Sequence, residues 1–333
     1  MTDAASSPRR AALIYNPVKA DGPRLCHAVT ALSHEYGWDE PLFLETSTDD
    51  AGQGRTREAL ASGVGAVVVA GGDGTVRAVA EVMGDTGVAL AIVPSGTGNL
   101  FARNLHLPLD DPERIIRAAF EGRTAAIDLG WAELTQEDGS SSEHAFVVLA
   151  GMGLDAYMIA NTRADLKKSV GWVAYIDGAA RSLPAAKPFR IVYQVEEHRL
   201  HSTKVHSMLF ANCGSLPAGI ELLPDASITD GELDIALIQP RGPLGWLAVW
   251  RTVWWQNSVL RRTRTGRRML EFARRDQSVR FLRGRSAEAA AAAPTPIELD
   301  GDEFGTAMRI RCRIAEGALL IVVPEGATTP VGD

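Results

Sequence analysis

Residues 65–75 read GAVVVAGGDGT, and this stretch decides the fold of the N-terminal part of the chain. Its first five residues, GAVVV, are apolar and rich in valine, which predicts a buried strand. The glycines that follow allow the backbone to turn sharply, and residues 76–83, VRAVAEVM, have a helical pattern. A strand, a glycine turn and a helix in this order are the repeating unit of an α/β domain.

The same alternation of strand and helix extends over the first hundred residues. The predicted strands cover residues 11–15, 41–46, 65–70 and 88–94, and the predicted helices cover residues 23–36, 53–62, 76–82 and the segment from 99 onward. We therefore expect an α/β domain with a mainly parallel sheet, whose ligands lie where the strands run out into loops.

The pattern changes after about residue 124, where many short β-type runs are separated by Gly, Pro and polar turns. These runs lie at residues 126–134, 144–150, 189–195, 199–212, 231–238, 277–282, 296–299, 308–314 and 318–323. They predict a mostly β domain of the sandwich type. Residues 136–143 and 286–296 read as loops, the second because two prolines interrupt a run of alanines that would otherwise favour helix.

Length and composition agree with two folded domains and exclude several classes of protein. The chain has 333 residues, of which 46% are hydrophobic and 23% charged, enough for two cores. We expect residues 1–126 to form the first domain, completed by the tail 320–333, and residues 127–319 the second. The net charge of −7 disfavours a nucleic-acid partner, which would require a basic face.

The sequence also indicates the compartment. Cys26, Cys213 and Cys312 lie far apart without CxxC pairing, which gives no zinc-ligand spacing and fits a reducing environment. The polar N-terminus does not read as a secretion signal, and residues 244–260, the most apolar later run, include polar and charged side chains. We expect a cytoplasmic protein without a transmembrane segment.

The loop at residues 70–75 suits a phosphate group. Its glycines let backbone amides approach an anion, and the helix that follows adds partial positive charge. Asp73 within it would repel phosphate directly, so a bridging Mg²⁺ or a proton-accepting role would explain the carboxylate. The alternative is a tight turn in which Asp73 or Thr75 caps the helix.

Two further turns follow predicted strands in the same way. Residues 94–99, PSGTGN, come after the strand VALAIV, and residues 15–20, YNPVKA, come after AALIY. Loops at the carboxyl ends of parallel strands can face one nucleotide together. Neither the Walker A pattern nor GxGxxG occurs at these positions, which disfavours a P-loop kinase or a dinucleotide dehydrogenase.

Taken in order, these segments resemble the catalytic domain of diacylglycerol kinases, sphingosine kinases and their bacterial lipid-kinase relatives. The resemblance continues through residues 151–156 (GMGLDA), 166–175, Asn212, 219–234 and the DGD at 300–302, and so extends from Ala11 to about Val323. It implies an N-terminal nucleotide domain of the NAD kinase/diacylglycerol kinase type and a C-terminal β-sandwich domain. It also implies ATP and Mg²⁺ as cofactors and a lipid hydroxyl as acceptor.

Site residues follow from the same resemblance. Catalytic roles would fall to Asp302 as general base, to Asp300 beside it in metal or proton handling, and to Asp73, which would hold catalytic Mg²⁺ or orient the acceptor. The ATP-binding set would be Asn16, Pro17, Val18, Lys19, Ala20, Thr46, Gly71, Gly72, Asp73, Gly74, Thr75, Arg77, Ser95, Gly96, Thr97 and Asn99. Asp230, with backbone atoms of Ser227 and Glu232, would bind a second, structural Mg²⁺.

The chain departs from the family pattern at three places. The first loop reads NPVKAD instead of NPxSG, so the serine and glycine contacts are missing and Lys19 is the candidate substitute. Arg77 stands where the first glycine loop usually ends in Asn or Glu. Asp302 is one methylene shorter than the usual Glu, which displaces a proton acceptor by roughly 1 Å.

Partners and competing functions complete the expectations. Residues 245–268 combine four tryptophans with a basic run, which favours either contact with an anionic membrane surface or a helix packed on the sandwich. This segment or an exposed edge strand is a candidate for a homodimer contact. The alternatives to a lipid kinase are a soluble-substrate kinase related to NAD kinase and a catalytically idle family member that binds lipid.

Overall fold

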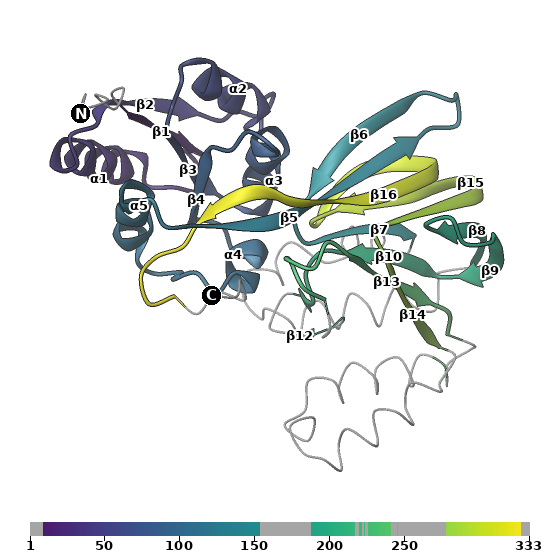
Figure 1. The fold of residues 1–333 in the computed structure, drawn as a ribbon. Helices are drawn as coiled ribbons and strands as arrows, with labels where there is room; N and C mark the ends of the chain where they lie inside the picture. The colour runs from purple at the N-terminus through teal and green to yellow at the C-terminus, as the bar shows by residue number, and fades with distance from the viewer. Residues whose placement is uncertain are drawn as a thin grey trace, which may run out of the picture. The chain divides into compact units, whose positions relative to one another are not determined.

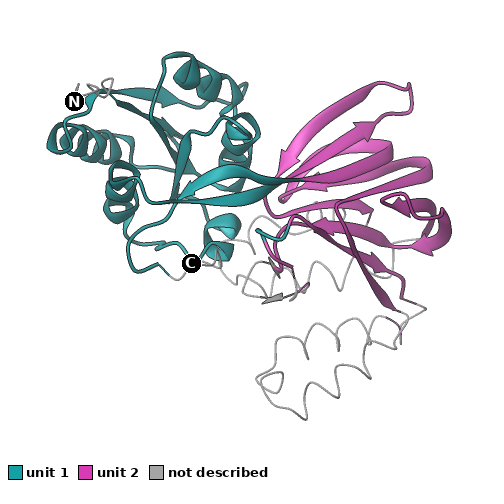
Figure 2. Ribbon diagram, viewed as in Figure 1, with its two compact units in different colours: residues 1–129, 228–230, 315–333 teal, residues 130–227, 231–314 magenta. Residues whose placement is uncertain are grey.

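The computed structural model describes residues 9–153, 188–216, 220–221, 223, 226–240, 245 and 278–327. The chain divides into two compact units (Figure 2). Unit 1 comprises Met1–Leu129, Ile228–Asp230 and Ala315–Asp333, and unit 2 comprises Gly130–Ser227 and Gly231–Ile314. Residues 246–268 of the tryptophan- and arginine-rich segment and residues 154–175 of the family pattern lie outside the described residues.

Unit 1 is built on a parallel sheet with helices on both faces (Figure 1). Its elements are β1 (Arg10–Tyr15), α1 (Gly22–Glu35), β2 (Asp39–Glu45), α2 (Gln53–Ala61), β3 (Ala66–Gly71), α3 (Asp73–Met83), β4 (Ala89–Pro94), α4 (Leu100–Asn104) and α5 (Pro112–Glu121). The strand order is β4-β3-β1-β2, and every neighbouring pair in this series is parallel. The predicted α/β alternation with a mainly parallel sheet is confirmed.

The core of unit 1 explains why its strands are so apolar. All six residues of β3 are buried, as expected for a central parallel strand that is covered on both faces. Helices α1 and α5 pack against each other on one face, and α2 and α3 pack against each other. On the first face, Leu13 and Val68 contact Val29 of α1 and Ile115 of α5 within one cluster of buried side chains.

Aspartates start two of these helices. Asp21 precedes α1 and accepts a hydrogen bond from the Arg24 amide at 3.2 Å, and Asp111 precedes α5 and accepts one from the Arg114 amide at 3.1 Å. Each helix also has proline in its first turn, where the missing N–H is not needed.

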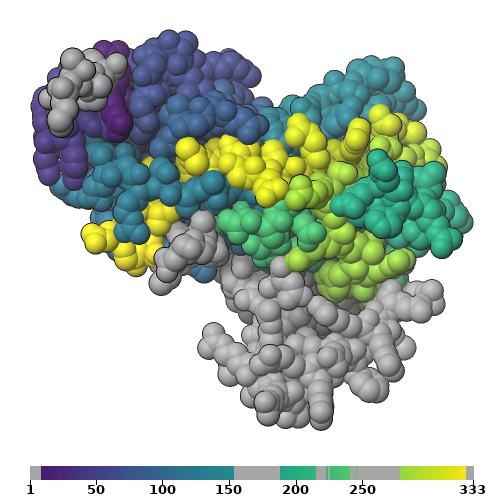
Figure 3. All heavy atoms as spheres, viewed as in Figure 1, coloured from purple at the N-terminus to yellow at the C-terminus, as the bar shows by residue number. Residues whose placement is uncertain are grey.

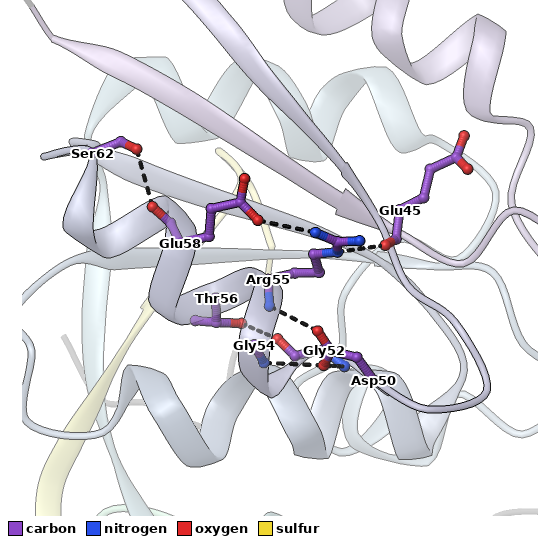
Figure 4. Close-up of polar contacts among 8 residues, drawn as sticks. All are labelled: Glu45, Asp50, Gly52, Gly54, Arg55, Thr56, Glu58 and Ser62. Atoms are coloured by element: carbon purple, nitrogen blue, oxygen red, sulfur yellow. Dashed lines mark hydrogen bonds and ion pairs between the residues drawn. The ribbon is translucent and has the colours of Figure 1, made fainter.

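Asp50 starts α2 in a similar way (Figure 4). Its carboxylate accepts hydrogen bonds from the backbone amides of Gly52 and Gly54, both at 3.0 Å, and of Arg55 at 3.1 Å. The Arg55 guanidinium then donates to the Glu45 carbonyl at 3.0 Å, at the end of β2. This cluster fixes the loop that leaves β2 and therefore the position of Thr46.

Replacing Asp50 with alanine should lower the free energy of unfolding by about 1–2 kcal/mol, because the helix loses its capping carboxylate. Urea denaturation of the purified protein measures this change. Asp49→Ala is the matched control, since Asp49 is the exposed neighbour of Asp50 and should leave stability nearly unchanged. Equal losses in both variants would contradict the capping role.

Unit 2 consists of antiparallel strands. The strands that form it or enter it are β5 (Thr124–Thr135), β6 (Ser141–Phe146), β7 (Leu149–Gly153), β8 (Phe189–Val195), β9 (His201–Val205), β10 (Ser207–Ala211), β11 (Ser215–Leu216), β12 (Ile220–Glu221), β13 (Leu233–Ile238), β14 (Val279–Gly284), β15 (Ser286–Leu299) and β16 (Asp302–Val322). Their order is β14-β13-β10-β7-β15-β16, while β8 pairs with β15 and β9, and β5 with β6 and β16. Phe146, Phe210 and Ile310 are fully buried in its core. The predicted β character is confirmed.

The two predicted loops were wrong in part. Residues 286–296 belong to the long strand β15, in which Ala287 and Ala289 face the core while the residues between them are partly exposed. Pairing with β8 on one side and β16 on the other overrides the helical preference of alanine. The prolines are tolerated because the register with β16 shifts between Ala290 and Thr295. In 136–143, residues 141–143 are already part of β6.

The chain returns to unit 1 through the last residues of β16. Leu320 pairs with Ala89 and Ile321 with Leu90, both in parallel with β4. Beyond the strand, the Val323 amide donates to the Arg123 carbonyl at 3.0 Å, and Arg114 of α5 donates to the Glu325 carbonyl. Figure 3 shows these yellow C-terminal residues beside the blue residues of the α5 segment.

Two expectations concern the chain as a whole. The cysteines Cys26, Cys213 and Cys312 are all unpaired thiols. Among the helices that the structure describes, none is both long enough and apolar enough to span a bilayer.

Candidate functional site

The order of the strands in unit 1 creates a natural ligand site at one edge of the sheet. From β1 the chain moves to β2 on one side, and from there it crosses to β3 on the other side of β1. The loops after β1 and β3 therefore leave the sheet in opposite directions, and ligands of α/β sheets bind at such a point. The predicted loops at residues 15–20, 70–75 and 94–99 lie at this edge, where β1, β3 and β4 end at Tyr15, Gly71 and Pro94.

The two glycine loops touch backbone to backbone. The Ser95 amide donates to the Gly71 carbonyl at 3.0 Å. A Cβ atom on Gly96 would lie 2.7 Å from the Gly72 Cα, and a Cβ atom on Gly98 would lie 2.7 Å from Oδ2 of Asp73. At position 96 only glycine allows this backbone approach, so residues 71–75 and 95–99 form one continuous surface.

The first loop is closed by its own asparagine. Oδ1 of Asn16 accepts hydrogen bonds from the amides of Val18 at 3.0 Å and Lys19 at 3.2 Å, and the Asn16 carbonyl accepts from the Ala20 amide at 2.9 Å. The Lys19 side chain extends toward the glycine loop at residues 71–75. A Cβ atom on Gly72 would lie only 2.9 Å from the Nζ of Lys19. This loop therefore brings a cation to the glycine surface.

Helix α3 starts at this surface without a capping side chain. Its N-cap residue is Gly72, and no side chain hydrogen bond caps it. By contrast, the N-cap residues Asp21 and Asp111 accept first-turn amides of α1 and α5. The N-cap residues of α2 and α4 also lack a capping side chain, but Asp50 and Asp73 accept first-turn amides of these two helices. The open amides and partial positive charge of α3, next to the Lys19 ammonium, suit an anion such as phosphate.

Asp73 lies in the first turn of α3 and reaches the loop at residues 95–99 and the start of α4. Its Oδ1 accepts a hydrogen bond from the Leu100 amide at 2.5 Å, which caps the short helix α4. The capping alternative placed Asp73 or Thr75 at the start of α3, but the N-cap of that helix is Gly72 without a capping side chain, and Asp73 instead caps α4. Burial raises the pKa of Asp73 above the usual aspartate value, although the amides of Leu100, Phe101 and Asn99 act in the opposite direction.

The raised pKa has a testable consequence for stability. A carboxyl group whose pKa rises on folding contributes stability below its unfolded pKa of about 3.9 and loses that contribution as pH increases through its folded pKa. Asp73→Asn removes this ionisation and keeps one acceptor oxygen for the Leu100 amide. The melting temperature of the variant, relative to wild type, should therefore rise as the pH increases from about 4. A relative decrease over this range would show that the amides outweigh burial.

The remaining predicted nucleotide residues occupy different positions. Thr46 is buried, and its amide donates to the Tyr15 carbonyl at 2.9 Å, so it lies at the ends of β1 and β2. Thr75 is also buried, whereas Pro17, Val18 and Thr97 are exposed. Arg77 is buried on α3, with its NH1 3.7 Å from the Glu81 carboxylate one turn along the same helix.

Sequence reasoning missed the residues that support Thr46. Besides Asp50 and Arg55, these are Tyr15 and Glu45, whose side chains form a 2.6 Å hydrogen bond between β1 and β2. This hydrogen bond is the main reason that the pKa of Tyr15 is raised, followed by burial. The Asp50-Ala51-Gly52 stretch offered a capping signal for α2, but nothing in the sequence pairs Tyr15 with Glu45.

The predicted catalytic carboxylates of unit 2 lie on the β15–β16 hairpin. Asp300 and Gly301 form its two-residue turn and both have positive φ, at 51° and 90°, which is the geometry of a type I′ turn. Asp302 is exposed directly after the turn. Asp300 is 6% exposed and accepts hydrogen bonds from the amides of Val147, Val148 and Leu149.

The predicted metal residues lie on the loop that leads into β13. Asp230 is exposed, Ser227 and Glu232 are half-buried, and Gly231 has a φ of 71° that permits the turn between them. The Glu232 carboxylate lies 3.5 Å from Arg283, which also forms a two-pronged contact with Asp234. No group of three or more His, Cys, Asp or Glu side chains within the described residues is arranged to hold a metal.

The fold and this site define the class of protein to which the chain belongs, a two-unit protein with a site for phosphate groups. A parallel sheet with an open helix N-terminus and a lysine at its switch point is a site for phosphate groups, and in this chain it is followed by an antiparallel β unit.

Comparison with known proteins agrees with this class. Residues 10–132 match the family model "Diacylglycerol kinase catalytic domain", and residues 147–323 match "YegS C-terminal NAD kinase beta sandwich-like domain". A Mycobacterium tuberculosis protein named "Diacylglycerol kinase" is 30% identical over 231 residues, 68% of this chain and 72% of its own length. A Pseudomonas putida protein, "Probable lipid kinase YegS-like", is 32% identical over 236 residues, 69% of this chain and 74% of its own length.

Solved structures share the fold. A Bacillus anthracis structure matches over 98% of this chain and 100% of its own, with a TM-score of 0.70 and 18% identity. Yeast NADH kinase matches over 97% of this chain and 86% of its own, with a TM-score of 0.51 and 11% identity. The chain belongs to the diacylglycerol kinase catalytic-domain family, whose bacterial members include the YegS-like lipid kinases. It is thus a kinase, and its fold is the predicted α/β domain followed by a β-sandwich domain.

Proposed function

We propose that this protein transfers the γ-phosphoryl group of ATP, in the presence of Mg²⁺, to a hydroxyl group of a lipid such as a diacylglycerol or a sphingoid base. Unit 1 would bind ATP and unit 2 would supply the groups that act on the acceptor. The names of the relatives support a lipid acceptor, since they are called diacylglycerol kinase or lipid kinase.

The observation that carries the proposal is the open N-terminus of α3 within the joined glycine loops. Phosphoryl transfer depends mainly on positioning and on neutralising the charge of the phosphates. Amides of the first turn of α3 would hold phosphate oxygens, and the Lys19 ammonium beside Gly72 would offset their charge. The tight contact between Gly72 and Gly96 keeps these donors in place before the nucleotide arrives.

The residues present also fit Mg²⁺, which prefers oxygen ligands and is usually held by one or two carboxylates together with phosphates and water. Asp73 is the carboxylate nearest the phosphate loops. Asp230 and the carbonyls of Ser227 and Glu232 would hold a second, structural ion, while the Glu232 carboxylate is engaged by Arg283. When bound, Mg²⁺ supplies charge neutralisation to the phosphates.

Asp302 would act as the proton acceptor for the lipid hydroxyl. It is exposed at the end of a rigid two-residue turn and so can approach a substrate. As the hydroxyl oxygen forms its bond to the γ-phosphorus, the proton passes to the Asp302 carboxylate and the bond to the β-phosphate oxygen breaks, releasing ADP.

The test is to incubate the purified protein with Mg-ATP and vesicles that contain diacylglycerol, a sphingoid base or a polyprenol, and to identify phosphorylated lipid by mass spectrometry. We expect one class of lipid to be phosphorylated, and we expect the product to be lost in Asp73→Asn and Asp302→Asn. Phosphorylation of NAD in a parallel reaction, without a lipid product, would overturn the proposal in favour of a soluble acceptor. ATP binding without turnover on any acceptor would indicate an idle lipid-binding protein.

A further inference from the structure

A cluster of buried polar contacts in unit 2 has no role in the function proposed so far. It joins the bend between β6 and β7, the end of β10 and the β15–β16 turn. We call this cluster the amide clamp, and it consists of Asp300, Asn212, Cys213 and the backbone of residues 147–149.

Asp300 supplies one side of the amide clamp. Its Oδ2 accepts a hydrogen bond from the Val147 amide at 2.7 Å, and its Oδ1 accepts from the amides of Val148 at 2.8 Å and Leu149 at 2.9 Å. The backbone amide of Asp300 itself donates to the Leu149 carbonyl at 2.9 Å. A carboxylate that binds three consecutive amides in a buried place is held in one orientation.

Asn212 and Cys213 supply the other side. Nδ2 of Asn212 donates to the Val147 carbonyl at 3.1 Å, and the Cys213 thiol donates to the same oxygen at 3.3 Å. The backbone amides of Asn212 and Cys213 donate to the Val148 carbonyl at 2.8 and 3.1 Å. The bend at residues 147 and 148 interrupts the strands, yet its backbone groups are satisfied by the amide clamp.

The amide clamp determines where Asp302 lies. Asp300 and Gly301 are the only residues between the paired positions Leu299 and Asp302, so a turn fixed at Asp300 leaves Asp302 little freedom. Leu299 is also paired with Ala150 on β7, directly after the clamped bend. The Asp302 backbone is therefore linked to residues 147–150 in two ways, through the side chain of Asp300 and through its paired residue Leu299.

We propose that Asp300, with Asn212, is a positioning residue that sets the proton acceptor Asp302, and that Asp300 itself neither transfers a proton nor binds metal. This inference rests on the proposed function of Asp302. It assigns the two acidic residues of the hairpin to different tasks, with the buried one binding backbone amides and the exposed one meeting the substrate.

Asp300→Asn tests the proposal with little change to the turn, because asparagine tolerates positive φ. An amide group cannot accept at both ends, so one of the three backbone amides loses its partner. With Mg-ATP and diacylglycerol in phosphatidylglycerol vesicles, kcat should fall about 10²-fold through misplacement of Asp302, while KM for ATP stays unchanged. In a plot of kcat against pH, the maximum should be lower than in the wild type, while the pH at which activity falls to half on the acid side should stay the same.

Leu237→Ala is the matched control. Leu237 is fully buried on β13 and pairs with Met208 and Arg280, outside the amide clamp. It should lower the melting temperature at least as much as Asp300→Asn and leave kcat close to wild type. Wild-type kcat in Asp300→Asn would overturn the proposal, and so would a shifted acid limb with an unchanged plateau.

Hydrogen exchange separates this inference from the proposed function. The amides of residues 147–149 should exchange slowly in the wild type and much faster in Asp300→Asn, while the amides of β13 should exchange at the same rate in both proteins. Equal exchange rates at residues 147–149 would contradict the amide clamp, whether or not the enzyme phosphorylates diacylglycerol. A wild type inactive on diacylglycerol, the sphingoid base and the polyprenol alike would instead contradict the proposed function. If Asp300→Asn does not fold, Asn212→Ser, which loses the donor to Val147, should show the same fall in kcat, and wild-type kcat there would overturn the proposal.

Discussion

Replacing Gly96 with alanine is expected to weaken ATP binding about 10²-fold, because it separates the two glycine loops. The new Cβ would lie 2.7 Å from the Gly72 Cα and 3.1 Å from Oδ1 of Asn99. Gly72 Cα is a backbone atom that cannot rotate away, so residues 71–75 must move relative to residues 95–99. The amides and the lysine that we propose to bind one phosphate group would then no longer converge.

Isothermal titration with ATP and Mg²⁺ measures this effect. Gly65→Ala is the matched control, since its Cβ would meet only ordinary contacts at 3.6 Å with Arg9 and Trp38 and its φ is not positive. The control should bind ATP like wild type. Gly96→Ala should also lose about 1–3 kcal/mol of stability from overpacking, so binding is compared below the melting temperature of both variants. Wild-type affinity in Gly96→Ala would contradict the joint phosphate surface.

Replacing Asp302 with asparagine should reduce lipid phosphorylation by about 10²- to 10⁴-fold, which is the usual contribution of a general base. Stability should change by less than about 0.5 kcal/mol, because the side chain is exposed. ATP binding should persist, since the phosphate loops lie in unit 1 and Asp302 lies in unit 2. Initial rates with vesicle-bound substrate, combined with thermal melting, measure both quantities.

Glu303→Gln is the matched control for Asp302→Asn. Glu303 is the next residue of β16 and is also exposed, but successive side chains of a strand point to opposite faces. If Asp302 is the base, Glu303→Gln should keep most of the activity. A large loss in Glu303→Gln with full activity in Asp302→Asn would assign the base to the longer carboxylate.

The strand and helix pattern of the first hundred residues was predictable because each element carries its own signal. The runs at β1, β3 and β4 are apolar and bounded by turns, and the start of α1 combines Asp with Pro. The start of α3 was placed three residues late, at Val76 instead of Asp73, because the glycines of the loop hide its first turn. Local signals identify elements better than their ends.

Other features could not be predicted because they depend on distant partners. The alanines of β15 became a strand through pairing with β8 and β16, against their own preference. The Asp300 carboxylate accepts hydrogen bonds from amides about 150 positions earlier in the chain, a contact that no local pattern reveals. Nothing near Arg77 in the sequence indicates that its side chain is buried with its guanidinium 3.7 Å from the Glu81 carboxylate, and its place in the ATP site stays a prediction.

The pairing of β16 with β4 has a consequence for protein synthesis. During translation, β1 to β4 and their helices emerge first, but the outer edge of β4 gains its partner only when Leu320 and Ile321 leave the ribosome. Until then, this apolar edge presents unpaired backbone groups that can recruit another strand. A nascent chain that stalls between the two halves of unit 1 would therefore be prone to aggregation and a natural client for chaperones.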